Sequence, residues 1–190
     1  MNIKKLVNLI FEWQHLKRIK HEGWRLAGVS NPDSVAEHSL VAAQIGYILA
    51  KMEWADVGKV VSMLIWHDIH EARIQDVHKL SLRYLWKKKL LEMEDKALQE
   101  QFEGLEFEKE IRQFNDEMNG RITLEWKIAK DADYLEQAFY AKYYVEIGYE
   151  AAQDWINNVW KTLQTDSAKK LFNEMLNTSF SQWWKGLKQL

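Results

Sequence analysis

The scarcity of chain breakers is the feature that most constrains the fold of this chain. Its 190 residues include one proline and eight glycines, the residues that most often interrupt regular structure. Apolar residues recur three and four positions apart along nearly the whole sequence, which is the spacing of amphipathic helices. The sequence therefore predicts an all-α fold with short connections, in a single domain large enough for one sizeable core.

The apolar spacing places the helices at 2–21, 34–52, 55–67, 69–78, 81–103, 106–118, 122–147, 151–163 and 167–188. The segment GRITLEWKI at 120–128 also alternates as a strand would. Helix is preferred there, because the apolar spacing continues through Ile128, Ala132, Leu135 and Phe139. The tryptophan-rich tail from about 151 to 190 forms two apolar helical faces. These faces are expected to cover the core, with a homodimer interface as the alternative.

Composition excludes several classes of function. Lys and Arg total 26 against 28 for Asp and Glu, so no nucleic-acid or membrane partner is expected, whereas a small charged substrate is compatible. Cysteine is absent, which removes disulfides, thiolate nucleophiles and Cys-type zinc sites. The N-terminus lacks the apolar run and cleavage site of a signal peptide, and no stretch is apolar for long enough to cross a bilayer. A soluble, cytoplasmic protein is expected.

The stretch SVAEHSL at 34–40 places a histidine near a helix start. Ser34 and Glu37 have the spacing of a capping box, so a helix should begin here. His38 then lies in the second turn, on the stripe of Val41 and Ile45 that should face the core. Taken alone, this pattern is more typical of a hydrogen-bonded core histidine than of a metal ligand.

A second stretch, VVSMLIWHDIHEARIQDV, begins at residue 60 and ends its apolar run in His67 and Asp68. Two ionisable groups there need compensation, which a divalent cation would supply. Imidazole and carboxylate together suit Mn, Fe, Co, Ni or Zn. Glu71 shares the face of the pair and could reach a metal-bound water. A plain hydrogen-bonded His–Asp pair is the alternative.

A third stretch, KIAKDADYLEQAF at 127–139, carries Asp131 and Asp133 in an apolar helix. Residues two apart on a helix point ~200° apart, so only one can face the core, and periodicity does not say which. Among the other histidines, His70 is expected to be exposed or to lie behind the ligands. His15, His21 and His78 show no ligand-like pattern.

Together these blocks resemble a known family. An early histidine, a His–Asp doublet and a distant aspartate are the pattern of HD-domain metal-dependent phosphohydrolases. LKRIKHEGW, PDSVAEHS, HDIHEARIQD and KDADYLE resemble the five-prime deoxynucleotidase subfamily, the YfbR-like proteins and their eukaryotic relatives. The resemblance spans about residues 14–148 and implies a single HD domain over 1–190, a helical bundle with additional C-terminal helices from about 151 to 190.

The resemblance also implies the site. It makes His38, His67, Asp68 and Asp133 the ligands of one divalent metal ion, with Mn, Co, Mg, Zn, Fe and Ni all compatible. Glu71 and Asp76 would be catalytic, with Asp76 also at the sugar hydroxyl and Trp24 contacting the sugar or closing the pocket. Two departures are visible: Gln75 stands where the family often has Gly, and Gly23 where bacterial members have Arg. The phosphate-binding cation is therefore sought among Arg18, Lys20 and Arg25, with Arg18 favoured.

The implied reaction is hydrolysis of nucleoside five-prime monophosphates, preferably deoxy ones, to nucleoside and phosphate. A nucleotide is thus the expected small-molecule partner. Two alternatives stay open. One is HD-type hydrolysis of another phosphoester, such as a nucleoside triphosphate, a cyclic nucleotide or a guanosine alarmone. The other is a nucleotide-binding protein that keeps a structural metal without turnover.

Overall fold

The computed structural model describes residues 2–187, and in this part of the chain all regular elements are helices. Their order is α1 (Ile3–His15), η1 (Glu22–Ala27), α2 (Val35–Met52), α3 (Val57–Trp66), α4 (Glu71–Ile74), α5 (Lys79–Leu82), α6 (Lys87–Phe102), α7 (Glu108–Gly120), α8 (Leu124–Glu146), η2 (Glu150–Ala152), α9 (Gln153–Trp160), α10 (Asp166–Asn177) and η3 (Gln182–Trp184). The predicted all-α fold is confirmed. The ambiguous segment 120–128 enters α8 as helix, not strand.

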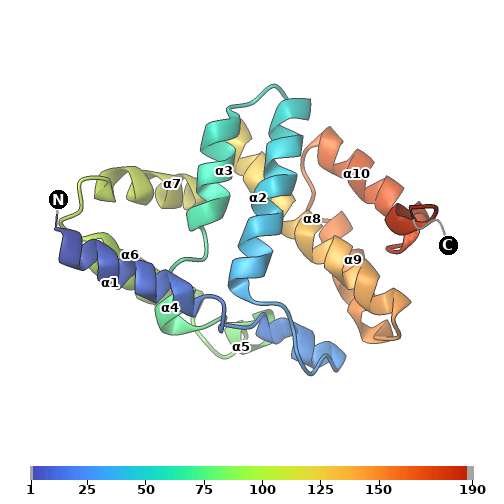
Figure 1. The fold of residues 1–190 in the computed structure, drawn as a ribbon, viewed down its shortest axis with the longest axis horizontal. Coiled ribbons are helices and arrows are strands. Elements are labelled where there is room, and N and C mark those ends of the chain that lie inside the picture. The colour runs from blue at the N-terminus through green and yellow to red at the C-terminus, as the bar shows by residue number, and fades with distance from the viewer. Residues whose placement is uncertain (1, 188–190) are drawn as a thin grey trace.

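Helices α2, α3 and α8 pack against one another at the centre of the molecule, as Figure 1 shows. On one side lie α1, α4, α6 and α7, and on the other lie α9 and α10 (Figure 1). The buried apolar side chains form two clusters. The larger joins α2, α3 and α8 to the C-terminal helices, and the smaller joins α1, α4 and α6. Helices α2, α3 and α8 thus belong to the larger cluster. His38 lies in α2, and His67 follows directly after α3.

The buried face of α2 differs from the predicted one. His38 is 1% exposed, but Val41 is 41% exposed and the buried line continues through Ala42 and Gly46. Small residues face inward because α2 lies close to α3: a Cβ at Gly46 would overlap the side chain of Leu64. Of the two residues predicted to face the core, Ile45 packs partly buried against it and Val41 does not, and close helix packing adds the small residues to the buried face.

Several predicted helices are shorter than expected. The first ends at His15, and an isolated bridge between Lys20 and Ser34 follows. The segment predicted at 69–78 is helical only over Glu71–Ile74, and the one at 81–103 is divided into α5 and α6. The last predicted helix, 167–188, gives α10 and the short η3, and its final residue lies outside the described residues.

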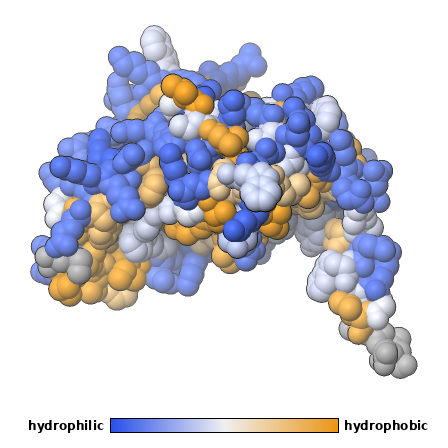
Figure 2. All heavy atoms as spheres, turned by 90° about the horizontal axis from the view of Figure 1, so that it is seen from above, coloured by the Kyte–Doolittle hydropathy of each residue, from blue (hydrophilic) through white to orange (hydrophobic). Residues whose placement is uncertain are grey.

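The surface is largely hydrophilic, as Figure 2 shows, with apolar side chains gathered at the edge beside the N-terminal end. There α1 exposes a row of large apolar side chains spaced three and four residues apart (Ile3, Val7, Ile10 and Phe11). Within the described residues, the structure contains no helix with the length and apolar character needed to span a membrane.

Candidate metal centre

The capping box at the start of α2 positions His38. The Glu37 carboxylate accepts a hydrogen bond from the Ser34 backbone N–H at 2.6 Å, while the Ser34 hydroxyl accepts from the Glu37 backbone N–H. Such a cap typically contributes about 1 kcal/mol. One turn further, the His38 ring faces α8, where its Nδ1 lies 2.6 Å from a Glu136 carboxylate oxygen. Since Glu136 holds Nδ1, the other ring nitrogen, Nε2, is turned toward the neighbouring histidine and carboxylates.

His67 and Asp68 follow directly after α3. The His67 Nδ1 lies 2.7 Å from the Leu64 carbonyl oxygen, which can only accept a hydrogen bond, so Nδ1 carries the proton. In the neutral ring, Nε2 then carries a lone pair and no proton. It lies 2.9 Å from an Asp68 carboxylate oxygen and 3.3 Å from the His38 Nε2. Electron-rich atoms thus converge here, which is favourable only if a proton or a cation lies between them.

α8 brings Asp133 to the same place. One of its carboxylate oxygens lies 3.4 Å from the His38 Nε2 and accepts from the Gln137 side chain, and the other accepts from the Lys130 ammonium at 2.6 Å. Asp131 points elsewhere, because its carboxylate accepts from the backbone N–H groups of Gln164 and Thr165. Both aspartates are buried, so the expectation that only one of them could face the core was wrong. Of the two, Asp133 lies in the cluster.

The donor spacing fits a divalent cation. The measured separations among the donor atoms of His38, His67, Asp68 and Asp133 run from 2.9 to 3.9 Å. Ligands about 2.1 Å from one octahedral ion are about 3.0 Å apart at right angles and about 4.2 Å apart when opposite. Imidazole with carboxylate is a donor set that first-row transition metals favour. The predicted metal cofactor is thus matched by a His/Asp cluster that could hold an ion.

The charges of the cluster follow from these contacts. Burial would lower the pKa of His38, but its hydrogen bonds to Asp133 and Glu136 raise that pKa well above its usual value. Burial would raise the pKa of Asp133, yet the Lys130 charge and the His38 contact hold it well below its ordinary range. Without a metal ion the site therefore favours a protonated imidazole beside carboxylates, and a divalent ion would take the place of that proton.

Glu71 opens α4 next to this cluster. One oxygen of its carboxylate is buried with no hydrogen-bond partner, and one atom each from Asp68, His70 and Glu71 lie within 4.8 Å of one another. Burial, with the charges of Asp68 and Asp76, raises the pKa of Glu71 well above its usual value. His70, expected to be exposed or behind the ligands, is 7% exposed, so the exposed alternative was wrong.

The predicted substrate residues lie around η1. Trp24 is 2% exposed, and its ring stacks on Trp155 with centroids 4.9 Å apart. Lys20 donates to the Pro32 carbonyl at 2.7 Å, and Arg25 pairs with Glu22 at 2.6 Å.

Arg18 is exposed in the turn after α1. Asp76 accepts from the Glu22 backbone N–H at 2.7 Å, which ties the loop after α4 to the start of η1. The substrate roles of Arg18, Lys20, Trp24 and Asp76 stay predictions.

Gln75 ends α4 in an unusual backbone conformation, with φ 68° and ψ 167°. Non-glycine residues held in this region carry a strain of about 1–3 kcal/mol. The departure noted in the sequence, Gln75 where the resembled family often has Gly, therefore falls at a position that glycine would occupy without strain. The neighbouring Asp76 nevertheless reaches its backbone partner on η1.

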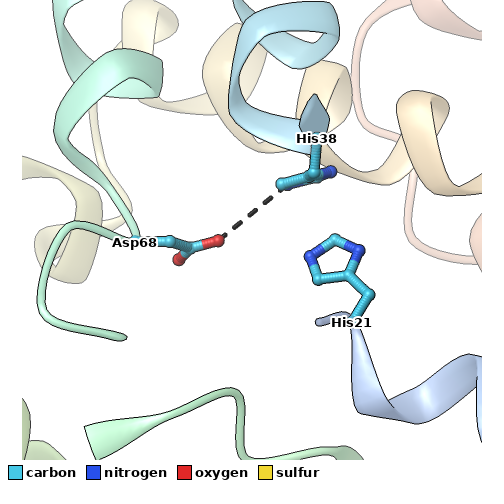
Figure 3. Close-up of side chains that lie close together, drawn as sticks. All are labelled: His21, His38 and Asp68. Atoms are coloured by element: carbon cyan, nitrogen blue, oxygen red, sulfur yellow. Dashed lines mark ion pairs between the residues drawn. The ribbon is translucent and has the colours of Figure 1, made fainter. Parts of the chain in front are cut away.

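Three further residues of the site were not predicted. Glu136 and Lys130 lie on α8 within three residues of Asp133, in the helical register that places them near it. The third is His21, whose ring centroid lies 4.4 Å from that of His38. It belongs to an irregular segment, where no periodicity could indicate its direction. Figure 3 shows the His21 ring beside His38, and one nitrogen of the His21 ring faces the side where Asp68 lies.

Comparison with known proteins gives a family match and several similar structures. A family model described as HD domain matches residues 13–176. A conserved hypothetical protein from Pyrococcus furiosus is 29% identical, with a TM-score of 0.75, 90% of this chain covered and 99% of the other. A protein from Pyrococcus horikoshii OT3 is 25% identical, with a TM-score of 0.72 and coverages of 89% and 97%.

A structure from Magnetospirillum magnetotacticum MS-1, described as a predicted metal-dependent phosphohydrolase, is 19% identical. Its TM-score is 0.67, with coverages of 96% and 97%, so it shares the fold. No curated protein matches the chain.

Proposed function

Because this chain belongs to the HD domain family, we propose that it is a metal-dependent phosphohydrolase that converts nucleoside five-prime monophosphates to nucleoside and phosphate. The observation that carries this proposal is the convergence of His38, His67, Asp68 and Asp133 beside Glu71, one oxygen of which is buried with no hydrogen-bond partner. The description of the Magnetospirillum magnetotacticum structure supports the same class of reaction.

A divalent ion bound by these residues would polarise a phosphate oxygen or lower the pKa of a bound water. The protein's own part is to hold the reactants and to move protons. The free oxygen of Glu71 is available to accept the proton of the attacking water. Arg18 or Lys20 would stabilise the charge on the non-bridging phosphate oxygens. Lys130, whose ammonium lies 2.6 Å from an Asp133 oxygen, adds a positive charge close to the reacting centre.

The finer identity that we propose is that of the five-prime deoxynucleotidase subfamily. Asp76 would contact the sugar hydroxyl and take part in catalysis, and Trp24 would shape the sugar side of the pocket. A nucleotide is the proposed small-molecule partner, with no nucleic acid or membrane involved. A cytoplasmic location and association as a homodimer also stay proposals.

Phosphate release from a panel of ribo- and deoxynucleoside monophosphates tests the function. Metal-stripped protein is resupplied separately with Mn, Co, Mg, Zn and Ni. We expect metal-dependent turnover that Asp68→Ala abolishes and that Asp116→Ala, on the exposed face of α7, leaves intact. Glu71→Gln should lower kcat by about 10²–10⁴-fold while the metal stays bound.

Other outcomes have distinct meanings. Unchanged turnover in Asp68→Ala contradicts the proposed site. A protein that releases pyrophosphate or tripolyphosphate from other nucleotides, but no phosphate from nucleoside monophosphates, contradicts the proposed substrate. The class of reaction would still hold.

A further inference from the structure

His21 lies close to the metal centre, although it belongs to the irregular segment between α1 and η1 and not to a helix that carries another ligand. Its backbone N–H donates to the Asp33 carbonyl at 3.1 Å, and the adjacent Lys20 pairs with Ser34, the cap of α2. These contacts fix the irregular segment against the start of the helix that carries His38. The His21 side chain is only 13% exposed, so its position is held by the same structure that places His38.

The three histidines around the site share one arrangement. Each has its Nδ1 next to an oxygen: the Glu136 carboxylate for His38, the Leu64 carbonyl for His67 and the Asp33 carboxylate for His21, the last at 3.3 Å. Metal-bound histidines nearly always hold their other ring nitrogen in this way, because the partner fixes the ring and its tautomer. The Nε2 of His21 is thereby left free, and Figure 3 shows a His21 nitrogen facing the side where Asp68 lies.

The carboxylate behind His21 points to the same role. Asp33 is 8% exposed, and neither oxygen has a hydrogen bond of good geometry. A buried carboxylate of this kind needs positive charge nearby. An imidazole that donates a hydrogen bond to Asp33 and binds a cation through its other nitrogen brings the positive charge close to this carboxylate.

We propose that His21 is a fifth protein ligand of the same metal ion, bound through Nε2 and oriented by Asp33. A single ion is proposed because His38 belongs to both groups: ligand atoms of His21, His38 and Asp68 lie within 4.8 Å of one another, and so do those of His38, His67 and Asp133. Asp68 also lies 2.9 Å from His67, which joins the two groups. This inference rests on the metal site of the proposed function.

Five protein donors change which ions suit the site. Zinc is most often held by four ligands in proteins, whereas manganese, cobalt and nickel accept six. The inference therefore favours an ion of higher coordination number, with one position left for water or a phosphate oxygen. The irregular segment that carries His21 would then help to determine which metal ion binds.

Metal affinity tests the role of His21 without reference to activity. The Kd for Co²⁺ is measured by competition with a chromophoric chelator in the metal-stripped full-length chain. We expect His21→Gln to weaken binding by about 10-fold or more and Asp33→Asn to weaken it to a smaller extent. The matched control is His15→Gln, an exposed histidine at the end of α1, which should bind as the parent does.

A second measurement needs no variant. In the proton NMR spectrum of the Co²⁺-loaded parent, the ring N–H of each bound histidine gives one exchangeable, strongly shifted signal. Three signals are expected, one each from His21, His38 and His67. Circular dichroism of metal-free His21→Gln checks that the variant is folded, and the signal count keeps the test decisive if it is not.

The two proposals fail differently. Equal Co²⁺ affinity in His21→Gln and parent, with two shifted signals in the parent, overturns the role of His21 and leaves the phosphohydrolase intact. A parent chain that binds no metal and releases no phosphate contradicts the proposed function itself.

Discussion

Asp131 and Asp133 are two residues apart on α8 and have opposite surroundings. Asp133 lies among His38, Lys130 and Gln137, whereas Asp131 accepts two backbone N–H groups and the Thr165 hydroxyl. The three donors belong to the connection between α9 and α10, so the Asp131 carboxylate holds this connection against α8. The two acids thus have different roles: Asp133 lies at the metal centre, and Asp131 fixes the start of α10.

Exchanging each acid for its amide should separate these roles. Asp133→Asn should weaken Co²⁺ binding by about 10-fold or more. Asp131→Asn should leave metal affinity unchanged but cost about 1–3 kcal/mol of stability, because an amide cannot accept from all three donors. Chelator competition and urea unfolding measure the two effects. Equal losses of affinity in both variants would contradict this assignment.

Only part of the site could be predicted from the sequence. Spacing alone placed His38, His67 and Asp68 at buried positions, whereas their assignment as metal ligands, and the choice of Asp133 over Asp131, needed the family resemblance. His21 could not be found in this way. Its direction depends on a bond from its backbone to Asp33 across a loop, and no local pattern encodes such a contact.

At the level of elements, the fold class followed from periodicity but the helix ends did not. The sequence from 69 to 78 has helical spacing, yet the chain leaves the helix at Gln75. Tertiary contacts override local preference there, because Asp76 bonds to the start of η1. The buried face of α2 shows the same effect, since close packing against α3 decided which residues turn inward.

Gly46→Ala should therefore destabilise the α2–α3 pair. The new methyl group would overlap Leu64 and approach Val60 within 3.1 Å, and such overpacking typically costs about 1–3 kcal/mol. Gly58→Ala is the matched control, because Gly58 is exposed in α3 and an alanine there gains up to about 1 kcal/mol of helix propensity. Urea unfolding compares them. A Gly46→Ala protein as stable as Gly58→Ala would contradict the packing argument.

At the level of the whole molecule, the pH dependence of stability should differ with and without metal. The pKa of His38 is raised well above its reference of 6.5, and that of His21 is raised as well. A group with a raised folded pKa contributes stability that is complete below the unfolded value and is lost as pH rises through the folded one. Asp68 and Asp133, whose pKa values are lowered, contribute constantly in this range.

The free energy of unfolding of the metal-stripped protein should thus fall as the pH rises above 6.5, the ordinary pKa of histidine. With saturating Co²⁺ it should fall less or rise, because the ion binds neutral imidazoles and competes with protons. Urea unfolding at a series of pH values, with and without the ion, checks both slopes. A metal-free protein that becomes more stable with rising pH would contradict the charge pattern of the site.

The distribution of the ligands along the chain also determines when the site can form. His38 lies near the N-terminal end of α2, His67 and Asp68 end α3, and Asp133 lies on α8, with the whole of α4 to α7 between them. Contacts between distant segments form late in folding, since the intervening loop must first be closed at a cost in entropy. Capture of the metal should therefore be among the last events of refolding and would mark the moment at which α8 packs against α2 and α3.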